Sequence, residues 1–295
     1  MARPVLRDLV STTGDLAALP TTVVRLLELL RDQTCAAERL AQVLDRDGAM
    51  TANVLKLCNS AFYGLRGTVT TTRQALVMLG NRAVATLAFA TGMVPVMRRH
   101  LVGYGMDRER FWEHSLHSAM AAGLASEQLG VGDRSCEAFT AGLVHDVGML
   151  VLDTHLATYG MTVLPTQPLF NVAERERDAL GFDHTEAGGL LASNWGLPAS
   201  LVAVITHHHC PWTAREDQEL AAAVLAGDMV AQMAHDGLQP EAWPRELEYL
   251  TGLGLGGDVL RELARIVAEA PDETLARVTH PAGSPWPHPE PAPVR

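Results

Sequence analysis

The chain has 295 residues, 47% of them hydrophobic, and a formal net charge of -11 at pH 7. This length suffices for one large domain or two small ones with a sizeable core. The acidic balance argues against a general nucleic-acid surface and against an anionic membrane surface. The longest apolar run, residues 84–97, is too short to span a bilayer and contains a proline, so we expect no membrane insertion.

The N-terminus, MARPVLRDLV, lacks the apolar core of a signal peptide. The four cysteines are widely spaced and form no CxxC pair, which is typical of reduced, buried thiols: Cys35, Cys58, Cys136 and Cys210. We therefore expect a cytoplasmic protein.

An amino-acid composition rich in Ala, Leu and Val, with few runs of β-branched residues, predicts an all-α protein. Residues 1–18 form a short lead-in with at most one helical turn. A helix then begins near Pro20, and further helices are expected at 36–44, 50–60, 70–79 and 82–97. Together, residues 19–103 make an N-terminal helical subdomain without a cluster of metal-ligand side chains.

The second half continues the helical pattern, and it contains most of the histidines. Helices are expected at 107–129, 134–145, 147–156, 171–180, 184–195, 198–208 and 216–234, then weakly at 245–251 and at 258–270. We assign 104–236 to a second helical subdomain and 237–278 to C-terminal helices. Residues 279–295 are rich in proline and lack periodicity, so we expect a disordered tail.

Residues 139–150, FTAGLVHDVGML, place an adjacent His145–Asp146 pair in a small, apolar run that includes Gly148. Buried imidazole and carboxylate groups are costly unless they are hydrogen-bonded, paired or metal-bound. For one such pair alone, a capped helix end with a hydrogen-bonded histidine is a sufficient explanation.

More groups of the same kind follow along the second half: His114, His184, the histidines at 207–209, and Asp228. Imidazole and carboxylate are the ligand types that hold divalent metals. Four or five helices that contribute them can close a one- or two-metal site.

The order of these residues resembles the HD-domain superfamily of metal-dependent phosphohydrolases. More closely, residues 19 to about 270 resemble the HDOD family, the HD-related output domains of bacterial signalling. The matching motifs are LP at 19–20, KLCNSAFYG at 56–64, QALVMLG at 74–80, FWEHS, AGLVHDVG, LGFDHTEAG, NWGLP and HHxP at 208–211. The resemblance implies an N-terminal helical bundle packed on an HD-like helical bundle.

The resemblance also implies a ligand set. One metal would be held by His114, His145, Asp146 and Asp228, and Asp146 would bridge to a second metal completed by His184 and by His208 or His209. Two such metals can hold a hydroxide and neutralise a phosphoryl group. Ligands of this kind suit Fe, Mn, Ni, Zn or Co. His207 is expected to be a spacer.

Two departures weaken an enzymatic interpretation. Catalytic HD proteins often carry a lysine directly after HD-I-G, where this chain has Met149, and no GYP motif follows the paired histidines. Members of the HDOD family are usually treated as signalling modules. The leading hypothesis is therefore a regulatory module that binds signalling proteins and carries a divalent-metal site. Its interactions could be modulated by a metal, or by a nucleotide, cyclic dinucleotide or other phosphorylated ligand in the HD cleft. The alternatives are a metal-dependent phosphohydrolase acting on such a ligand, and a structural module without metal.

Three smaller expectations concern single side chains. Lys56 and Asn59 could bind an anion, but a network that braces the end of their helix is the simpler role. His117 could line the same face as His114. His235 matches no motif and is expected at the surface.

Overall fold

The structure is a computed structural model that describes residues 5–12, 19, 21–31, 37–59, 67–158 and 172–269. These residues form helices and no strand, apart from one isolated antiparallel bridge between Leu101 and Met106. The all-α prediction is therefore confirmed. The expected tail at 279–295 and residues 60–66 of the N-terminal motif lie outside the described residues.

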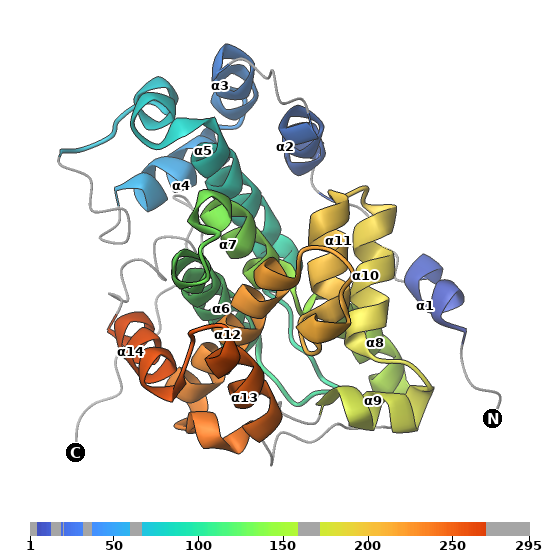
Figure 1. Ribbon diagram of the computed structural model, residues 1–295. Coiled ribbons are helices and arrows are strands. Elements are labelled where there is room, and N and C mark those ends of the chain that lie inside the picture. The colour runs from blue at the N-terminus through green and yellow to red at the C-terminus, as the bar shows by residue number, and fades with distance from the viewer. Residues whose placement is uncertain are drawn as a thin grey trace, which may run out of the picture.

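The described residues of the N-terminal part form five helices: α1 (Leu6–Thr12), α2 (Thr21–Arg31), α3 (Ala37–Asp45), α4 (Gly48–Cys58) and α5 (Thr72–Met97). Helices α2, α3 and α4 pack against α5 and form the upper group in Figure 1. The lead-in is more structured than expected, because α1 is a helix of seven residues that packs on α8 and α10.

Local chemistry sets the ends of these helices. The side chain of Asp47 accepts a hydrogen bond from the backbone N–H of Met50 at 3.0 Å, so α4 begins at Gly48, two residues before the expected start. Thr71 caps α5 in the same way. The predicted break at Gly80 is present as a kink with φ 81° and ψ 164°, and the two expected helices form one element across it.

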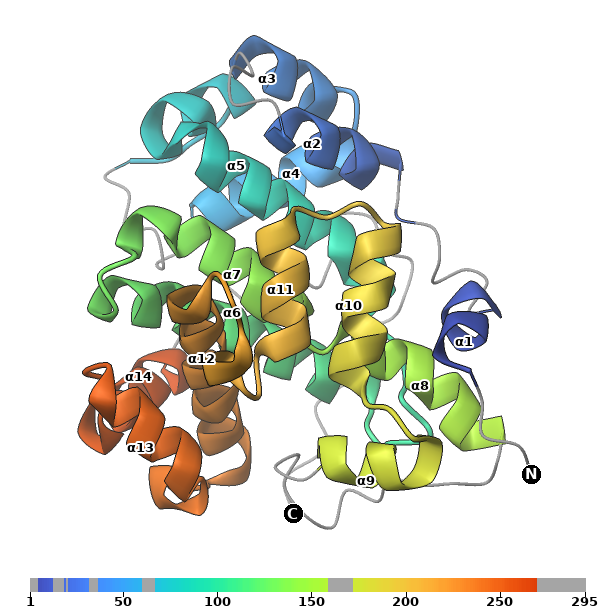
Figure 2. The same cartoon turned by 45° about the vertical axis from the view of Figure 1, so that its right-hand side comes forward.

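The second half runs from α6 to α14, with bounds close to those expected: α6 (Arg108–Gln128), α7 (Ser135–Val144), α8 (Val147–Thr158), α9 (Val172–Leu180), α10 (His184–Asn194), α11 (Ala199–His207), α12 (Gln218–Asp236), α13 (Pro244–Gly252) and α14 (Gly257–Ala268). Helix α6 packs along α12 and α7, and α10 packs on α8 and α11. Figure 2 shows α7, α11 and α12 beside one another below the N-terminal group, with α13 and α14 at the lower edge.

Glycines allow the central helices to approach closely. A Cβ on Gly148 would lie 1.9 Å from the carbonyl oxygen of His184, and one on Gly227 would lie 2.4 Å from that of Ser118. Such distances exclude any side chain unless the backbone moves. The contacts of α8 with α10 and of α12 with α6 therefore depend on glycine, and both bring histidine and aspartate side chains together.

Two stretches, Thr72–Met97 and Gly132–Asp153, are long and apolar enough to cross a membrane by length and composition. Their most apolar windows are 61% and 83% buried inside the fold. Core helices of this kind pass the same test, so the two stretches are weak indicators of membrane insertion.

Candidate metal centre

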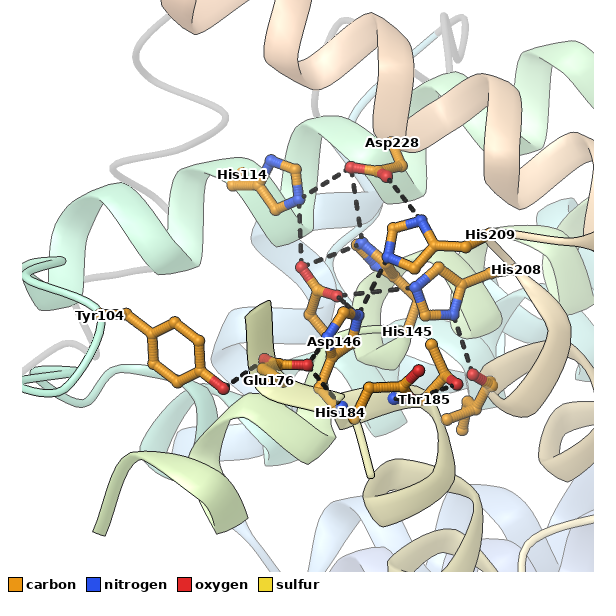
Figure 3. Close-up of polar contacts among 12 residues, drawn as sticks. Tyr104, His114, His145, Asp146, Glu176, His184, Thr185, His208, His209 and Asp228 are labelled. Carbon is orange, nitrogen blue, oxygen red and sulfur yellow. Dashed lines mark hydrogen bonds and ion pairs between the residues drawn. The ribbon is translucent and has the colours of Figure 1, made fainter. Parts of the chain in front are cut away.

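Five segments bring their metal-ligand side chains to one point in the second half (Figure 3). His145 and Asp146 lie between α7 and α8, and His184 is the first residue of α10. His114 lies within α6 and Asp228 within α12, while His208 and His209 directly follow α11. All are buried except His209, which is partly buried.

The seven residues form two groups, and within each group the potential ligand atoms all lie within 4.8 Å of one another. In the first group, Nε2 of His114 lies 3.3 Å from Oδ1 of Asp228, and Nε2 of His145 lies 3.9 Å from the same oxygen. This group joins α6, α12 and the end of α7.

The second group contains Asp146, His184, His208 and His209. Oδ1 of Asp146 lies 3.3 Å from Nε2 of His184 and 3.7 Å from Nε2 of His208. Its other oxygen, Oδ2, lies 3.4 Å from Nε2 of His114 and 3.3 Å from Nε2 of His145. Asp146 therefore lies between the groups, with one carboxylate oxygen toward each.

Four of the imidazole rings present their Nε2 atoms to Asp146, and His209 presents its Nδ1 to Asp228 at 3.8 Å. Nδ1 of His145 donates to the carbonyl oxygen of Gly142 at 2.7 Å, and Nδ1 of His208 donates to that of Ile205 at 2.8 Å. A proton held on Nδ1 leaves the lone pair on Nε2 available as a ligand. The Nε2 atoms of His114, His145 and His208 are buried and have no hydrogen-bond partner. Buried ring nitrogens gathered beside two carboxylates fit a bound cation well.

Charge is arranged unevenly among the histidines. Burial lowers the pKa of His114, but Asp146 and Asp228 outweigh burial and raise it to about 9. Burial likewise lowers the pKa of His184, but Glu176 and Asp146 raise it to about 10. Without a metal, these two rings therefore carry the protons that neutralise the carboxylates.

The pKa values of His208 and Asp146 are instead lowered. Burial, together with the neighbouring charges of His209 and His145, lowers the pKa of His208 well below its ordinary value. Burial would raise the pKa of the Asp146 carboxyl, but His145 and His114 hold it well below the ordinary value. The centre thus contains ionised carboxylates and a neutral imidazole at His208, which are the forms that bind metal, while a metal would have to displace the protons of His114 and His184.

A second layer of side chains orients the ligands, and the sequence interpretation assigned it no role. Glu176 is buried, and its Oε2 accepts from Nδ1 of His184 at 2.7 Å and from the backbone N–H of His184 at 2.8 Å. The hydroxyl of Tyr104 donates to Oε1 of the same carboxylate at 2.5 Å. On the other side, Nε2 of Gln232 donates to Oδ1 of Asp228 at 2.8 Å.

Other sequence expectations have mixed outcomes. Nδ1 of His207 lies 3.0 Å from the Thr213 hydroxyl, outside both groups, in line with a spacer. His117 is buried beside α12, and its Nδ1 lies 3.0 Å from Nε2 of His235. The expectation that His235 lies free at the surface is therefore wrong, because the packing of α6 on α12 half-buries it.

Of the two roles considered for Lys56 and Asn59, anion binding and bracing of a helix end, the contacts of Asn59 support the second. The side-chain amide of Asn59 donates to the carbonyl oxygens of Leu55 and Val69, at 2.8 and 2.7 Å, and its Oδ1 accepts from the N–H of Val69 at 2.7 Å. Both amide hydrogens are thus used in bracing the end of α4, which argues against Asn59 as an anion ligand. Anion binding by Lys56 stays a prediction.

Comparison with known proteins identifies the family to which this chain belongs. The sequence profile of the HDOD domain matches residues 16–211. The chain belongs to the HDOD family. A curated relative, an uncharacterized protein of Treponema pallidum, is 24% identical over 240 residues, which cover 79% of this chain and 45% of that protein. The match therefore spans less than half the length of this relative.

Solved structures share the fold. An HDOD domain protein of unknown function from Geobacter sulfurreducens has a TM-score of 0.64 and 23% identity, covering 90% of this chain and 96% of that one. A proposed metal-dependent phosphohydrolase from Shewanella amazonensis has a TM-score of 0.62 and 16% identity, covering 90% and 97%. A proposed signal transduction protein from Marinobacter aquaeolei has a TM-score of 0.67 and 20% identity, covering 92% and 64%. At these identities the likeness concerns the HDOD fold.

Proposed function

We propose that this HDOD protein is a regulatory module of bacterial signalling whose second half holds one or two divalent metals, and which acts by binding partner proteins. The observation that carries the metal site is the set of three buried Nε2 atoms without hydrogen-bond partners, facing two carboxylates. Buried lone pairs and charges of this kind are costly without a cation.

The two groups suggest how ligands divide between two ions. His114, His145 and Asp228 would hold one metal, and His184, His208 and His209 the other. Asp146 would bridge them, because each of its oxygens faces one group. The resulting mixture of imidazole and carboxylate suits Fe, Mn, Ni, Zn or Co.

The space beside this centre favours regulation over turnover. Among the described residues, the cavity there measures about 10 Å³ and is lined by Asp146, Met149, Val172, His184, His209, Asp228 and Gln232. That volume holds about one water molecule. No arginine or lysine belongs to this lining, and Met149 stands where catalytic HD proteins often place a lysine, so the described walls offer no cation for a substrate phosphate.

The alternative is a metal-dependent phosphohydrolase acting on a nucleotide or cyclic dinucleotide. The observation in its favour is the position of Asp146 between two ligand groups. A bound pair of metals would supply Lewis-acid stabilisation of a phosphoryl group and an activated water. The chain's own residues would fix the metal positions, and Gln232 would hold the Asp228 carboxylate in place.

The two functions are separated by a turnover assay. The protein is loaded with Mn²⁺ or Fe²⁺ under reducing conditions and assayed with bis(p-nitrophenyl) phosphate, nucleotides and cyclic di-GMP, beside Asp146→Ala. The regulatory proposal expects no turnover above that of the variant, together with capture of a signalling protein by the metal-loaded chain. Turnover that Asp146→Ala abolishes, without any captured partner, would overturn it in favour of the phosphohydrolase.

We place this module in the cytoplasm, with a separate signalling protein as partner and without membrane insertion or nucleic-acid binding. The support is the acidic net charge of -11 and the absence of paired cysteine motifs from the sequence.

A further inference from the structure

A second cavity of about 210 Å³ lies away from the metal centre, where α5 of the N-terminal group meets α7 and α11. Its lining includes Phe89 from α5, Cys136 from the first turn of α7, and Leu201 from the first turn of α11. The metal-ligand side chains follow the opposite ends of α7 and α11, at His145 and His208. The two sites therefore lie at the two ends of the same helices.

The walls of this cavity are mainly apolar. Phe89 and Leu201 are buried side chains that face it together with Pro198. The hydroxyl of Thr140 donates to the carbonyl oxygen of Cys136 at 2.9 Å, and that of Thr86 donates to the same oxygen at 3.4 Å. Because both hydroxyls are already used, the interior suits the apolar body of a ligand.

The charges at the cavity are largely balanced among themselves. Nε of Arg134 lies 2.8 Å from Oε2 of Glu137, and its NH1 lies 2.7 Å from Oδ1 of Asp217. The other carboxylate oxygen of Glu137 accepts from the hydroxyl of Ser200. These groups tie α7, α11 and the start of α12 together, and they leave little capacity for a ligand.

Two lining charges stand outside this network. Asp133 is exposed and precedes α7, where the dipole at the helix N-terminus offsets its negative charge. Arg82 lies on α5 and forms no ion pair within the described part of the chain. Its charge helps to lower the pKa of the Glu137 carboxyl, but its exposed guanidinium makes no direct ion pair there and can receive an anionic group.

We propose that this cavity binds a small organic anion, with an apolar body against Phe89, Pro198 and Leu201 and an anionic head group on Arg82. A carboxylate and a phosphate monoester share this chemistry. The bound anion would connect α5 to α7 and α11, and so join the N-terminal group to the half that contains the metal centre. Thr140, the lining residue of α7 nearest the metal centre, precedes His145 by roughly 7.5 Å along the helix at about 1.5 Å per residue, so the ligand and the metals would occupy separate sites.

This site goes beyond the proposed function and needs no metal, so the two can fail independently. Cys136 supplies a local probe, because its thiol lines the cavity and is half-buried. The full chain, treated with a chelator so that the anions meet no metal beside Cys210, is labelled with N-ethylmaleimide at about pH 8; burial raises the pKa of both the Cys136 and Cys210 thiols, so both label slowly. Mass spectrometry then gives the labelling rate of each cysteine, and Cys210, half-buried elsewhere, serves as the internal reference.

Labelling is repeated with millimolar hexanoate, hexyl phosphate, hexanol or hexylammonium. The proposal expects at least one of the two anions to slow labelling of Cys136 by about tenfold, while Cys210 is unaffected and the neutral and cationic compounds do little. The anion that protects better identifies the head group. Protection by hexanol equal to that by the anions, or no protection by either anion, would overturn the proposal.

Variants locate the head group. Arg82→Gln should raise the anion concentration needed for half-protection by about tenfold, because a charge-assisted contact is lost. The matched control is Arg73→Gln, which removes an exposed arginine from the same helix and should leave protection unchanged. Both residues are exposed, so both variants should fold. Equal protection in wild type and Arg82→Gln would contradict the assignment of Arg82.

Discussion

At the residue scale, the imidazole of His184 is held from behind by a buried carboxylate. Glu176 accepts from both the ring and the backbone of His184, and Tyr104 donates to its other oxygen. A carboxylate behind a metal-binding histidine fixes the ring orientation and raises its basicity. In the proposed metal site, Glu176 would therefore prepare His184 as a ligand without reaching the centre itself.

Replacing Glu176 with Gln should weaken metal binding by roughly 10- to 100-fold, because an amide orients and polarises the imidazole less than a carboxylate does. Competition with a chromogenic chelator measures the affinity. Glu174→Gln, an exposed change on the same helix, is the control and should bind metal as the wild type does. Equal affinity in both variants would mean that the Glu176 contact has only a structural role.

Metal affinity should also rise with pH. The pKa values of about 9 for His114 and about 10 for His184 mean that both rings are protonated at pH 7 in the metal-free protein. A metal must displace these protons, so affinity should increase by at least about tenfold per pH unit. Calorimetric titration with Mn²⁺ between about pH 6.5 and 8 checks this, within the range where the unbound ion stays soluble. An affinity independent of pH would contradict the assignment of these rings as ligands.

The convergence of the candidate ligand residues could be predicted from sequence, whereas the side chains that support them could not. His145–Asp146 is conspicuous in an apolar run, but Glu176 lies in a helix dense with charges, VAERERDAL, where it looks like one more solvated acid. Its burial follows from the packing around His184, which no local pattern encodes. His235 was misplaced for a similar reason, because its partner His117 is 118 positions away in the chain.

At the element scale, the contact between α8 and α10 sets the distance between Asp146 and His184. The backbone of Gly148 lies against that of His184, with no room for a Cβ. The capping box at Asp183 fixes where α10 begins, because its side chain accepts from the N–H groups of Thr185 and Glu186. A close helix contact and a fixed helix start together place His184 at the centre.

Gly148→Ala should destabilise the fold by at least about 2 kcal/mol, because a Cβ 1.9 Å from a carbonyl oxygen forces the helices apart. Chemical denaturation in the presence of a chelator measures the loss without a contribution from metal. The control is Gly252→Ala, where a Cβ meets no atom within 4 Å and the change should be close to neutral. Similar stability of both variants would show that the helices can separate at little cost.

Helix positions were predicted well because caps and breakers are local signals. Asp183 and the Gly196–Pro198 turn each mark a helix boundary that the structure retains, and Gly80 marks the kink within α5. The close approach of α8 to α10 could not be predicted in the same way. Gly148 looked only like the end of an apolar run, and its requirement comes from a helix that begins 36 positions later, at His184.

At the scale of the whole molecule, buried histidines link stability to pH. Burial, with smaller effects from the charges of His235 and His114, lowers the pKa of His117 from 6.5 to about 4. Above pH 6.5 the ring is neutral in both the folded and unfolded chains and has no effect. As the pH falls from 6.5 toward 4, the unfolded chain gains a proton that the folded chain does not, so stability falls.

His117→Gln should therefore lose less stability than the wild type between about pH 7 and 5, since one such group contributes up to about 1.4 kcal/mol per pH unit. Urea denaturation with chelator at each pH gives the comparison, and the metal-centre groups contribute equally to both proteins. His100→Gln, at an exposed position, should follow the wild type. An unchanged pH dependence in His117→Gln would show that this ring titrates normally in the folded chain.

The central claim is that the second half of this HDOD protein binds divalent metal through Asp146 and the histidines around it. The most direct measurement is elemental analysis of protein purified without a metal-affinity tag, beside Asp146→Ala and the exposed control Asp178→Ala. We expect about one to two equivalents in the wild type and control, and loss of bound metal in Asp146→Ala. A folded wild type that retains no metal, even after loading with Mn²⁺ or Fe²⁺ under reducing conditions, would contradict the account.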